Sequence, residues 1–188
     1  MKKTDKYHLT KDDTVLIETA SSLHDIGKIA ISNEIFNKPG RLTEEEKRIM
    51  QDHSVLGAKM LENLSFYKNE PLVKYVCEIC RYHHERYDGR GYPDGLVGDE
   101  IPISAQVVSI VDAYDALISE RVYKETIDGK AALKMIQEGK CGVFNPLLIE
   151  CFTEIQPFVE KELNKNYLFE QREYINDKTN ELIKEKGI

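Results

Sequence analysis

Histidine and aspartate side chains stand out among the groups of this sequence that could do chemistry. Four of the five histidines and two aspartates occur in segments rich in apolar residues: His24, Asp25, His53, His83, His84 and Asp112. A lone imidazole in such a place is usually a hydrogen-bonded core residue, but six polar groups are costly to bury unless they share a charged partner. Imidazole nitrogens and carboxylate oxygens together are ligands for iron, manganese, zinc and related ions.

Six ligands exceed the tetrahedral set of a single ion, so the pattern indicates two adjacent metal ions with a bridging carboxylate. Two ions roughly 3.5–4 Å apart can activate one water molecule and also bind a phosphoryl oxygen. Lys28 lies about one helical turn after His24, from where its ammonium group could offset the charge on that oxygen in the transition state. The residues alone therefore predict metal-assisted hydrolysis of a phosphate ester.

The elements that must position these groups are predicted to be helices, because apolar residues recur at three- and four-residue steps nearly throughout. Capping-box patterns at Thr10–Asp13 and Thr43–Glu46, and a proline at position 71, mark three helix starts. We expect helices over 10–27, 43–64, 71–83, 104–119 and 131–139, and again from residue 146. Two segments that contain Gly and Pro, 33–42 and 86–102, are expected to be loops, and the second is long enough to suggest a functional role.

Composition limits the class of protein. The chain has 188 residues, 41% of them hydrophobic and 31% charged, which is ordinary for a soluble globular protein. A net charge of −7 argues against a DNA-coating protein, which needs a basic face. No apolar run suits a membrane span or a signal peptide, and four scattered cysteines favour a reducing cytoplasm. We expect a cytoplasmic protein with one globular domain over 1–155 and a charge-rich helical tail over 156–188.

The order of these motifs resembles the HD-GYP subgroup of the HD phosphohydrolases. The resemblance covers about residues 14–152 and rests on these motifs: His24-Asp25, Asn37–Thr43, His53–Gly57, His83–Arg86, Asp88-Gly89, Gly91-Tyr92-Pro93, Asp112–Leu117 and Arg121–Lys124. It implies an all-α fold, an HD-domain helical bundle with a Gly/Pro-rich GYP loop. It also implies a metal-dependent phosphodiesterase that hydrolyses cyclic di-GMP to pGpG, and in some members to GMP, by means of a metal-bridged hydroxide.

The resemblance further implies roles for individual residues. The metal ligands of the family match the six His and Asp residues named above, with Asp25 as the bridging carboxylate, and Lys28 matches a lysine beside the scissile phosphate. Tyr92, Arg121 and Lys124 match positions that contact the substrate, where a tyrosine can stack on a base and cations can bind phosphate. The implied cofactor is two or more divalent ions, iron or manganese first, with zinc, nickel or magnesium as alternatives.

The sequence departs from the family pattern at three places. That pattern has one more helix upstream with a further histidine ligand, and His8 lies too close to His24 to replace it. Gln106 and Asn145 stand where the family commonly has arginine and aspartate. These departures keep two alternatives open: a module that binds a nucleotide or a partner without turnover, and an HD hydrolase for another phosphate ester.

Further partners are expected from the family's usual organisation. Such domains commonly follow a sensor, receiver or diguanylate-cyclase domain in signalling proteins, and a homodimer is a further option.

Glu85 and Arg86 directly follow the paired histidines, where they either contact the substrate or form an ion pair on the surface.

Overall fold

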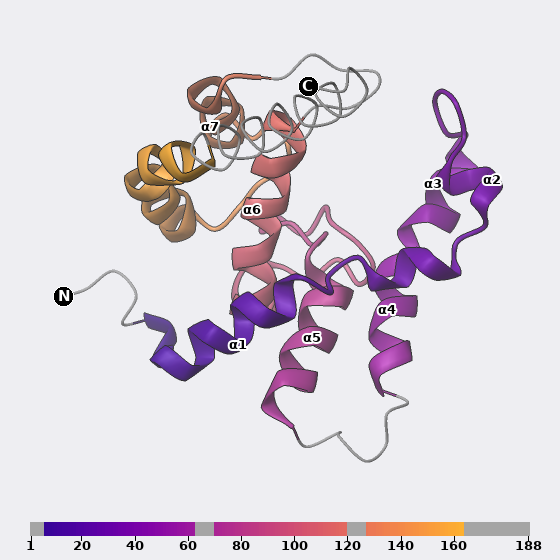
Figure 1. The fold of residues 1–188 in the computed structure, drawn as a ribbon, viewed down its shortest axis with the longest axis horizontal. Helices are drawn as coiled ribbons and strands as arrows, with labels where there is room; N and C mark the ends of the chain where they lie inside the picture. The colour runs from indigo at the N-terminus through magenta and orange to yellow at the C-terminus, as the bar shows by residue number, and fades with distance from the viewer. Residues whose placement is uncertain (1–5, 63–69, 120–126, 164–188) are drawn as a thin grey trace, which may run out of the picture. The chain divides into compact units, whose positions relative to one another are not determined.

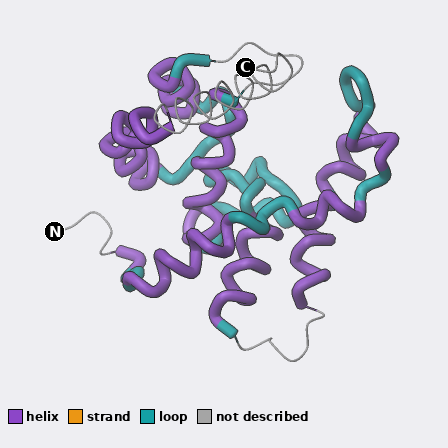
Figure 2. Tube along the Cα trace, viewed as in Figure 1, coloured by secondary structure: helices purple, strands orange, loops and turns teal. Residues whose placement is uncertain are grey.

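The structure is a computed structural model that describes residues 6–62, 70–119 and 127–163. These residues form helices and connecting loops without any strand (Figure 2), so the predicted all-α fold is confirmed. The elements, including the 3₁₀ helices η2 and η4, are α1 Lys11–Ser21, η2 Ile26–Ala30, α2 Asn33–Phe36, α3 Glu44–Gln51, α4 His53–Glu62, α5 Pro71–Tyr82, η4 Gly98–Glu100, α6 Ile103–Ile118 and α7 Gly129–Gln137.

Contacts divide the chain into two units, residues 1–150 and residues 151–188. The first unit contains every element named above, and its residues 146–150 are also helical. In the second unit residues 151–163 are helical. The predicted division after residue 155 stays a prediction. In the described ranges, no helix combines the length and apolar character that crossing a bilayer requires.

The helix starts follow the predicted local chemistry. In α1 the Asp13 N–H donates to Thr10 Oγ1 at 3.1 Å, and the Thr10 N–H donates to Asp13 Oδ2 at 2.8 Å. Thr43 and Glu46 form the same reciprocal pair at the start of α3, and Pro71 occupies the first turn of α5. Each arrangement satisfies or avoids N–H groups that the first turn of a helix leaves without partners.

The chain turns at two places where the sequence predicts continuous helices. The first helix ends at Ser21 instead of continuing to Gly27, and the predicted helix over 43–64 is interrupted at Asp52. Asp52 has φ −60° and ψ −18°, which is ordinary right-handed backbone that needs neither Gly nor Pro to form. The segment 33–42, predicted to be entirely loop, begins with the single-turn helix α2.

The core of the first unit lies where α1, α4, α5 and α6 meet. Buried apolar side chains from all four helices contact one another there: Ile17, Ala20, Ala58, Val76, Ile79, Cys80 and Val108. Helices α4 and α5 run side by side, with α1 packed against α5 (Figure 1). This packing brings the C-terminal end of α5, the N-terminal end of α4 and the turn after α1 to one place.

Glycine permits the closest of these approaches. A Cβ atom on Gly27 would lie 1.9 Å from the backbone oxygen of His53 and 2.5 Å from the backbone nitrogen of Gly57. Only a residue without a side chain allows η2 to lie this close to α4. The close contact fixes the position of Asp25, which immediately precedes η2, relative to the start of α4.

Candidate metal centre

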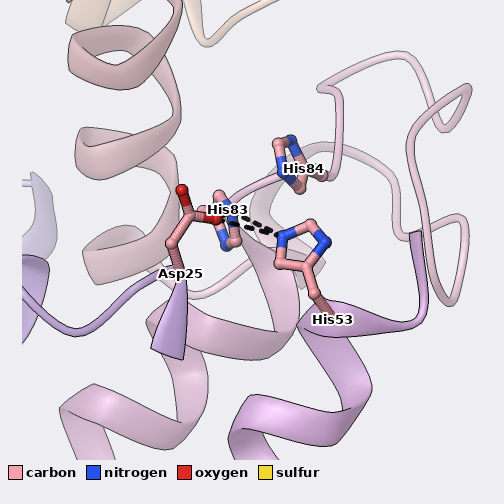
Figure 3. Close-up of side chains that lie close together, drawn as sticks. All are labelled: Asp25, His53, His83 and His84. Atoms are coloured by element: carbon pink, nitrogen blue, oxygen red, sulfur yellow. Dashed lines mark hydrogen bonds and ion pairs between the residues drawn. The ribbon is translucent and has the colours of Figure 1, made fainter. Parts of the chain in front are cut away.

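Four of the predicted ligands gather at helix ends. Asp25 precedes η2, His53 is the first residue of α4, and His83 and His84 follow the last turn of α5. One potential ligand atom from each of these residues lies within 4.8 Å of all the others (Figure 3). His53 and His83 are only 1% and 0% exposed. Apolar periodicity predicts helices around these histidines, but it does not show that they lie where the helices start or stop.

Backbone carbonyls orient three of the imidazole rings. The Nδ1 atoms of His24, His53 and His83 lie 2.8, 2.6 and 2.9 Å from the carbonyl oxygens of Ser21, Met50 and Ile79, respectively. A carbonyl oxygen only accepts hydrogen bonds, so each Nδ1 carries the proton and donates. In the neutral ring the Nε2 lone pair is then free to bind a metal, which is the usual arrangement for metal-binding histidines.

The Nε2 atoms of His53 and His83 face each other at 3.5 Å. With both Nδ1 atoms protonated, neither neutral ring can donate a hydrogen bond to the other. Two facing lone pairs repel each other unless a positive charge lies near both. This pair therefore supports a cation in the cluster.

Asp25 supplies the negative charge of the cluster. Its Oδ1 lies 3.3 Å from His53 Nε2 and 3.8 Å from His83 Nε2, while Oδ2 lies 3.2 Å from His24 Nε2 and accepts a hydrogen bond from Lys28 Nζ. Burial alone would raise the pKa of Asp25, but hydrogen bonds with His24 and Lys28 outweigh burial and lower that pKa, so the group is ionised.

One oxygen of this carboxylate lacks a conventional partner. Asp25 Oδ1 is buried and accepts no hydrogen bond from the described part of the chain. A buried carboxylate oxygen in this state is costly, and a metal ion would compensate it.

The paired histidines His83 and His84 have lowered pKa values. Burial, with a contribution from neighbouring histidines, lowers the pKa of His83 to about 4 and that of His84 to about 2. Both rings are therefore neutral near pH 7, and a neutral imidazole is the form that binds metals. Their ring centroids lie 3.9 Å apart.

His24 and Asp112 lie beside this group rather than within it. His24 Nε2 is 3.7 Å from Asp112 Oδ1, and its hydrogen bond with Asp25 raises the pKa of His24. Burial raises the pKa of Asp112. The two oxygens of Asp25 thus face different sets of imidazoles, His53 and His83 on one side and His24 on the other.

These donors fit divalent metal ions in chemistry and spacing. Metal–nitrogen bonds of about 2.0–2.1 Å place opposite ligands of one ion roughly 4 Å apart, which matches the separations in the cluster. Nitrogen and carboxylate donors suit transition metals such as iron, manganese and zinc, but do not distinguish among them.

The predicted substrate-contacting residues are placed only in part. The Tyr92 ring stacks on the His84 ring, with centroids 4.7 Å apart and planes inclined by 25°. Lys28 contacts the cluster through Asp25. Arg121 and Lys124 lie outside the residues that the structure describes.

Glu85 and Arg86 do not form the surface ion pair considered from the sequence. Glu85 is 2% exposed, and its carboxylate accepts hydrogen bonds from backbone N–H groups. The guanidinium group of Arg86 is half-buried and donates to Ser109 Oγ at 2.7 Å and to three backbone oxygens, those of Cys141, His83 and Glu85. The sequence indicated charges beside the histidines, but periodicity did not reveal that a loop covers them.

The two other departures from the family pattern contact each other. The side-chain amide of Asn145 donates to Gln106 Oε1 at 2.7 Å, and Gln106 Nε2 donates to the Ile101 oxygen at 2.7 Å. Both side chains are buried. An amide pair therefore stands where the expected pattern has arginine and aspartate, and each amide keeps a hydrogen-bonded partner.

Comparison with known proteins identifies the family. A family model described as "HD domain" matches residues 3–146, which is most of the chain. This chain belongs to the HD domain family. The matched residues include the pair His24-Asp25, and both residues lie in or beside the cluster described above.

Several proteins similar to this chain carry names of cyclic dinucleotide phosphodiesterases. A "Probable cyclic di-GMP phosphodiesterase" of Vibrio cholerae is 42% identical over 163 residues, 84% of this chain and 37% of that protein. The "Cyclic di-GMP phosphodiesterase response regulator RpfG" of Xanthomonas campestris is 40% identical over 142 residues, 76% of this chain and 36% of that protein. A "3'3'-cGAMP-specific phosphodiesterase 2" of Vibrio cholerae is 38% identical over 148 residues, which cover 79% of this chain and 28% of that protein.

These comparisons confirm the resemblance to the HD-GYP type of HD domain. The chain spans only about a third of the length of these relatives.

Proposed function

We propose that this HD domain is a metal-dependent phosphodiesterase that hydrolyses cyclic di-GMP. The observation that carries the proposal is the cluster of Asp25, His53, His83 and His84, with its oriented imidazoles and its unpaired carboxylate oxygen. The names of relatives with 40–42% identity support cyclic di-GMP as the substrate.

The residues of the chain then divide into ligands and substrate contacts. The six predicted ligands are His24, Asp25, His53, His83, His84 and Asp112. Asp25 is the bridging ligand in this proposal, because its two oxygens face different histidines. Lys28, which donates to Asp25, adds positive charge where the phosphodiester oxygens would develop negative charge.

The substrate contacts are assigned to Tyr92, Arg121 and Lys124. The ring of Tyr92 borders the cluster through its stack on His84, so a bound base could contact it. The assignments of Arg121 and Lys124 rest on the sequence resemblance alone.

The cofactor is proposed to be two or more divalent ions, iron or manganese first, with zinc, nickel or magnesium as alternatives. When bound, such ions supply an activated water molecule and a Lewis acid for a phosphoryl oxygen. The protein contributes imidazoles already oriented by carbonyl groups, and an ionised carboxylate between them.

A second candidate substrate is 3'3'-cGAMP, because a relative with 38% identity carries that specificity in its name. A module that binds nucleotide without turnover is the alternative from another class.

A sensor, receiver or diguanylate-cyclase partner domain is also proposed, supported by the name "response regulator" of one relative. A homodimer and a cytoplasmic location stay predictions.

Metal analysis followed by hydrolysis assays tests the proposal. Protein purified without chelator at low oxygen is expected to contain at least two equivalents of iron or manganese, and to convert cyclic di-GMP to the linear dinucleotide. Asp25→Ala and His83→Ala should abolish turnover without loss of helical content, whereas His8→Ala, which alters an exposed histidine, should not.

The outcomes separate the alternatives. Faster hydrolysis of 3'3'-cGAMP than of cyclic di-GMP would favour the second substrate. Tight binding of cyclic di-GMP by metal-loaded protein without any product would favour the binding module, and normal turnover by either cluster variant would refute the proposed metal mechanism.

A further inference from the structure

Glu85 is one of the few buried charged side chains in the described residues, and its partners lie on the loop that follows it. One carboxylate oxygen, Oε1, accepts hydrogen bonds from the N–H groups of Asp94 at 2.7 Å and Gly95 at 3.0 Å. The other, Oε2, accepts one from the Leu96 N–H at 3.1 Å. Three consecutive backbone amides therefore converge on one carboxylate, and such charge-assisted bonds are stronger than bonds between neutral groups.

The same loop carries the tyrosine that lies against the metal centre. The Tyr92 ring stacks on His84, and the Tyr92 N–H donates to the His84 carbonyl oxygen at 3.3 Å. Next to it, Gly91 lies so close to the backbone of Glu85 and Arg86 that a Cβ atom there would be 2.4 Å from the Arg86 nitrogen. The loop thus lies directly against the end of α5.

We propose that Glu85 is a positioning residue, whose carboxylate holds the loop over residues 88–97 so that the Tyr92 ring stays against the imidazole of His84. Because Glu85 directly follows His84 in the chain, one short stretch of backbone carries both the ligand and the group that anchors the loop. Its role in catalysis rests on the proposed function, but the position of the loop does not.

An ion pair also holds this loop on its exposed side. Arg81 donates to both carboxylate oxygens of Asp94, each at 2.9 Å. This pair is partly exposed, where ion pairs contribute little, whereas the Glu85 carboxylate is buried. Glu85→Gln keeps the shape of the side chain but presents an NH₂ group to an N–H donor, so at least one hydrogen bond is lost and two donors face each other.

A single-tryptophan reporter can follow the loop, because the chain contains no tryptophan. We would place Tyr92→Trp in the metal-loaded protein and measure acrylamide quenching with and without Glu85→Gln. The matched control is Glu100→Gln, which removes a carboxylate that accepts the Val97 N–H, at 2.8 Å, near the end of the same loop. Release of the loop is expected to raise the quenching constant about threefold in the Glu85 variant and to leave the control unchanged.

Limited trypsin digestion with the native Tyr92 provides a measurement that does not depend on the reporter. The side chain of Arg90 is 88% exposed, but Gly91, on the other side of the bond that trypsin would cut, is packed against Glu85. Cleavage after Arg90 is expected to become about tenfold faster in Glu85→Gln while the urea midpoint of the whole chain changes little.

Unchanged quenching together with unchanged cleavage at Arg90 would overturn the proposal. Faster cleavage at every tryptic site with a lower urea midpoint would also overturn it, because Glu85 would then only stabilise the fold. An equal effect of Glu100→Gln would do the same. Neither measurement uses a nucleotide or activity, so a wrong substrate assignment would leave both results interpretable.

Discussion

Substitution of Gly27 by alanine is the most direct test of how the fold brings Asp25 to the histidines. The added Cβ atom would lie 1.9 Å from the His53 oxygen and 2.5 Å from the Gly57 nitrogen. Both neighbours are backbone atoms, so no side chain can rotate away. Ordinary carbon–oxygen contact requires η2 and α4 to separate by roughly 1.5 Å, and Asp25 and His53 lie at the ends of the two elements that must separate.

The expected magnitude follows from overpacking of a buried contact. Small-to-large substitutions in packed interiors cost about 1–3 kcal/mol, and a collision between backbone atoms belongs at the upper end. For a chain of this size each kcal/mol lowers the melting temperature by about 2–4 °C, so Gly27→Ala should lower it by about 5–10 °C. Separation of Asp25 from His53 should also weaken metal binding, by an amount comparable to the 10–100-fold losses seen when supporting groups are removed.

Thermal melts followed by circular dichroism, together with metal content per chain, measure both effects. The matched control is Gly57→Ala, on the other side of the same contact, where a Cβ atom would lie 3.1 Å from the Gly27 nitrogen. There the gain in helix propensity, about 1 kcal/mol, should offset most of the tighter contact. Equal stability and metal content in Gly27→Ala and the parent protein would refute the close approach of η2 to α4.

Three further results are expected. Chelation of the metal should lower the melting temperature, because a ligand that binds only the native state stabilises it by about 2.7 kcal/mol at a concentration a hundredfold above its Kd. Thermal melts with and without EDTA measure this effect, and the melting temperature of His84→Ala should differ less between the two conditions. Tyr92→Phe keeps the ring that stacks on His84 and should change KM less than about threefold, whereas Tyr92→Ala should raise it at least about tenfold; steady-state kinetics compare them, and equal defects would assign the role to the hydroxyl. Arg86→Met leaves four oxygen acceptors without their donor and should lower the free energy of unfolding by about 3 kcal/mol in urea titrations; a loss below about 1 kcal/mol would contradict the importance of that network.

The helix starts were predictable because their signals are local. Thr10 with Asp13, and Thr43 with Glu46, form the reciprocal bonds that their spacing predicts, and Pro71 begins α5. The points where the helices end or are interrupted were harder to predict from the sequence. Asp52 keeps helical dihedral angles while the chain turns, so tertiary packing, and not residue type, decides that α4 begins at His53.

The site could be predicted in composition but not in arrangement. The number of histidines in apolar segments indicated a metal centre, because each buried imidazole needs a partner. The orientation of three of the rings depends on carbonyls such as those of Met50 and Ile79, which every residue possesses and no sequence pattern marks. Glu85 was missed as an anchor for the same reason, since its partners are backbone N–H groups.

The placement of the cluster at helix ends has a consequence for the dynamics of the bundle. Terminal turns normally open first, and their amides exchange fastest with solvent. In this protein His83 directly follows the last turn of α5 and His53 is the first residue of α4, and both are among the most buried residues. Fraying at these ends would expose unpaired imidazoles, so we expect the amides at the C-terminal end of α5 to exchange more slowly than those of its first turn. Local opening of this helix would then begin at its first turn and proceed toward the metal centre.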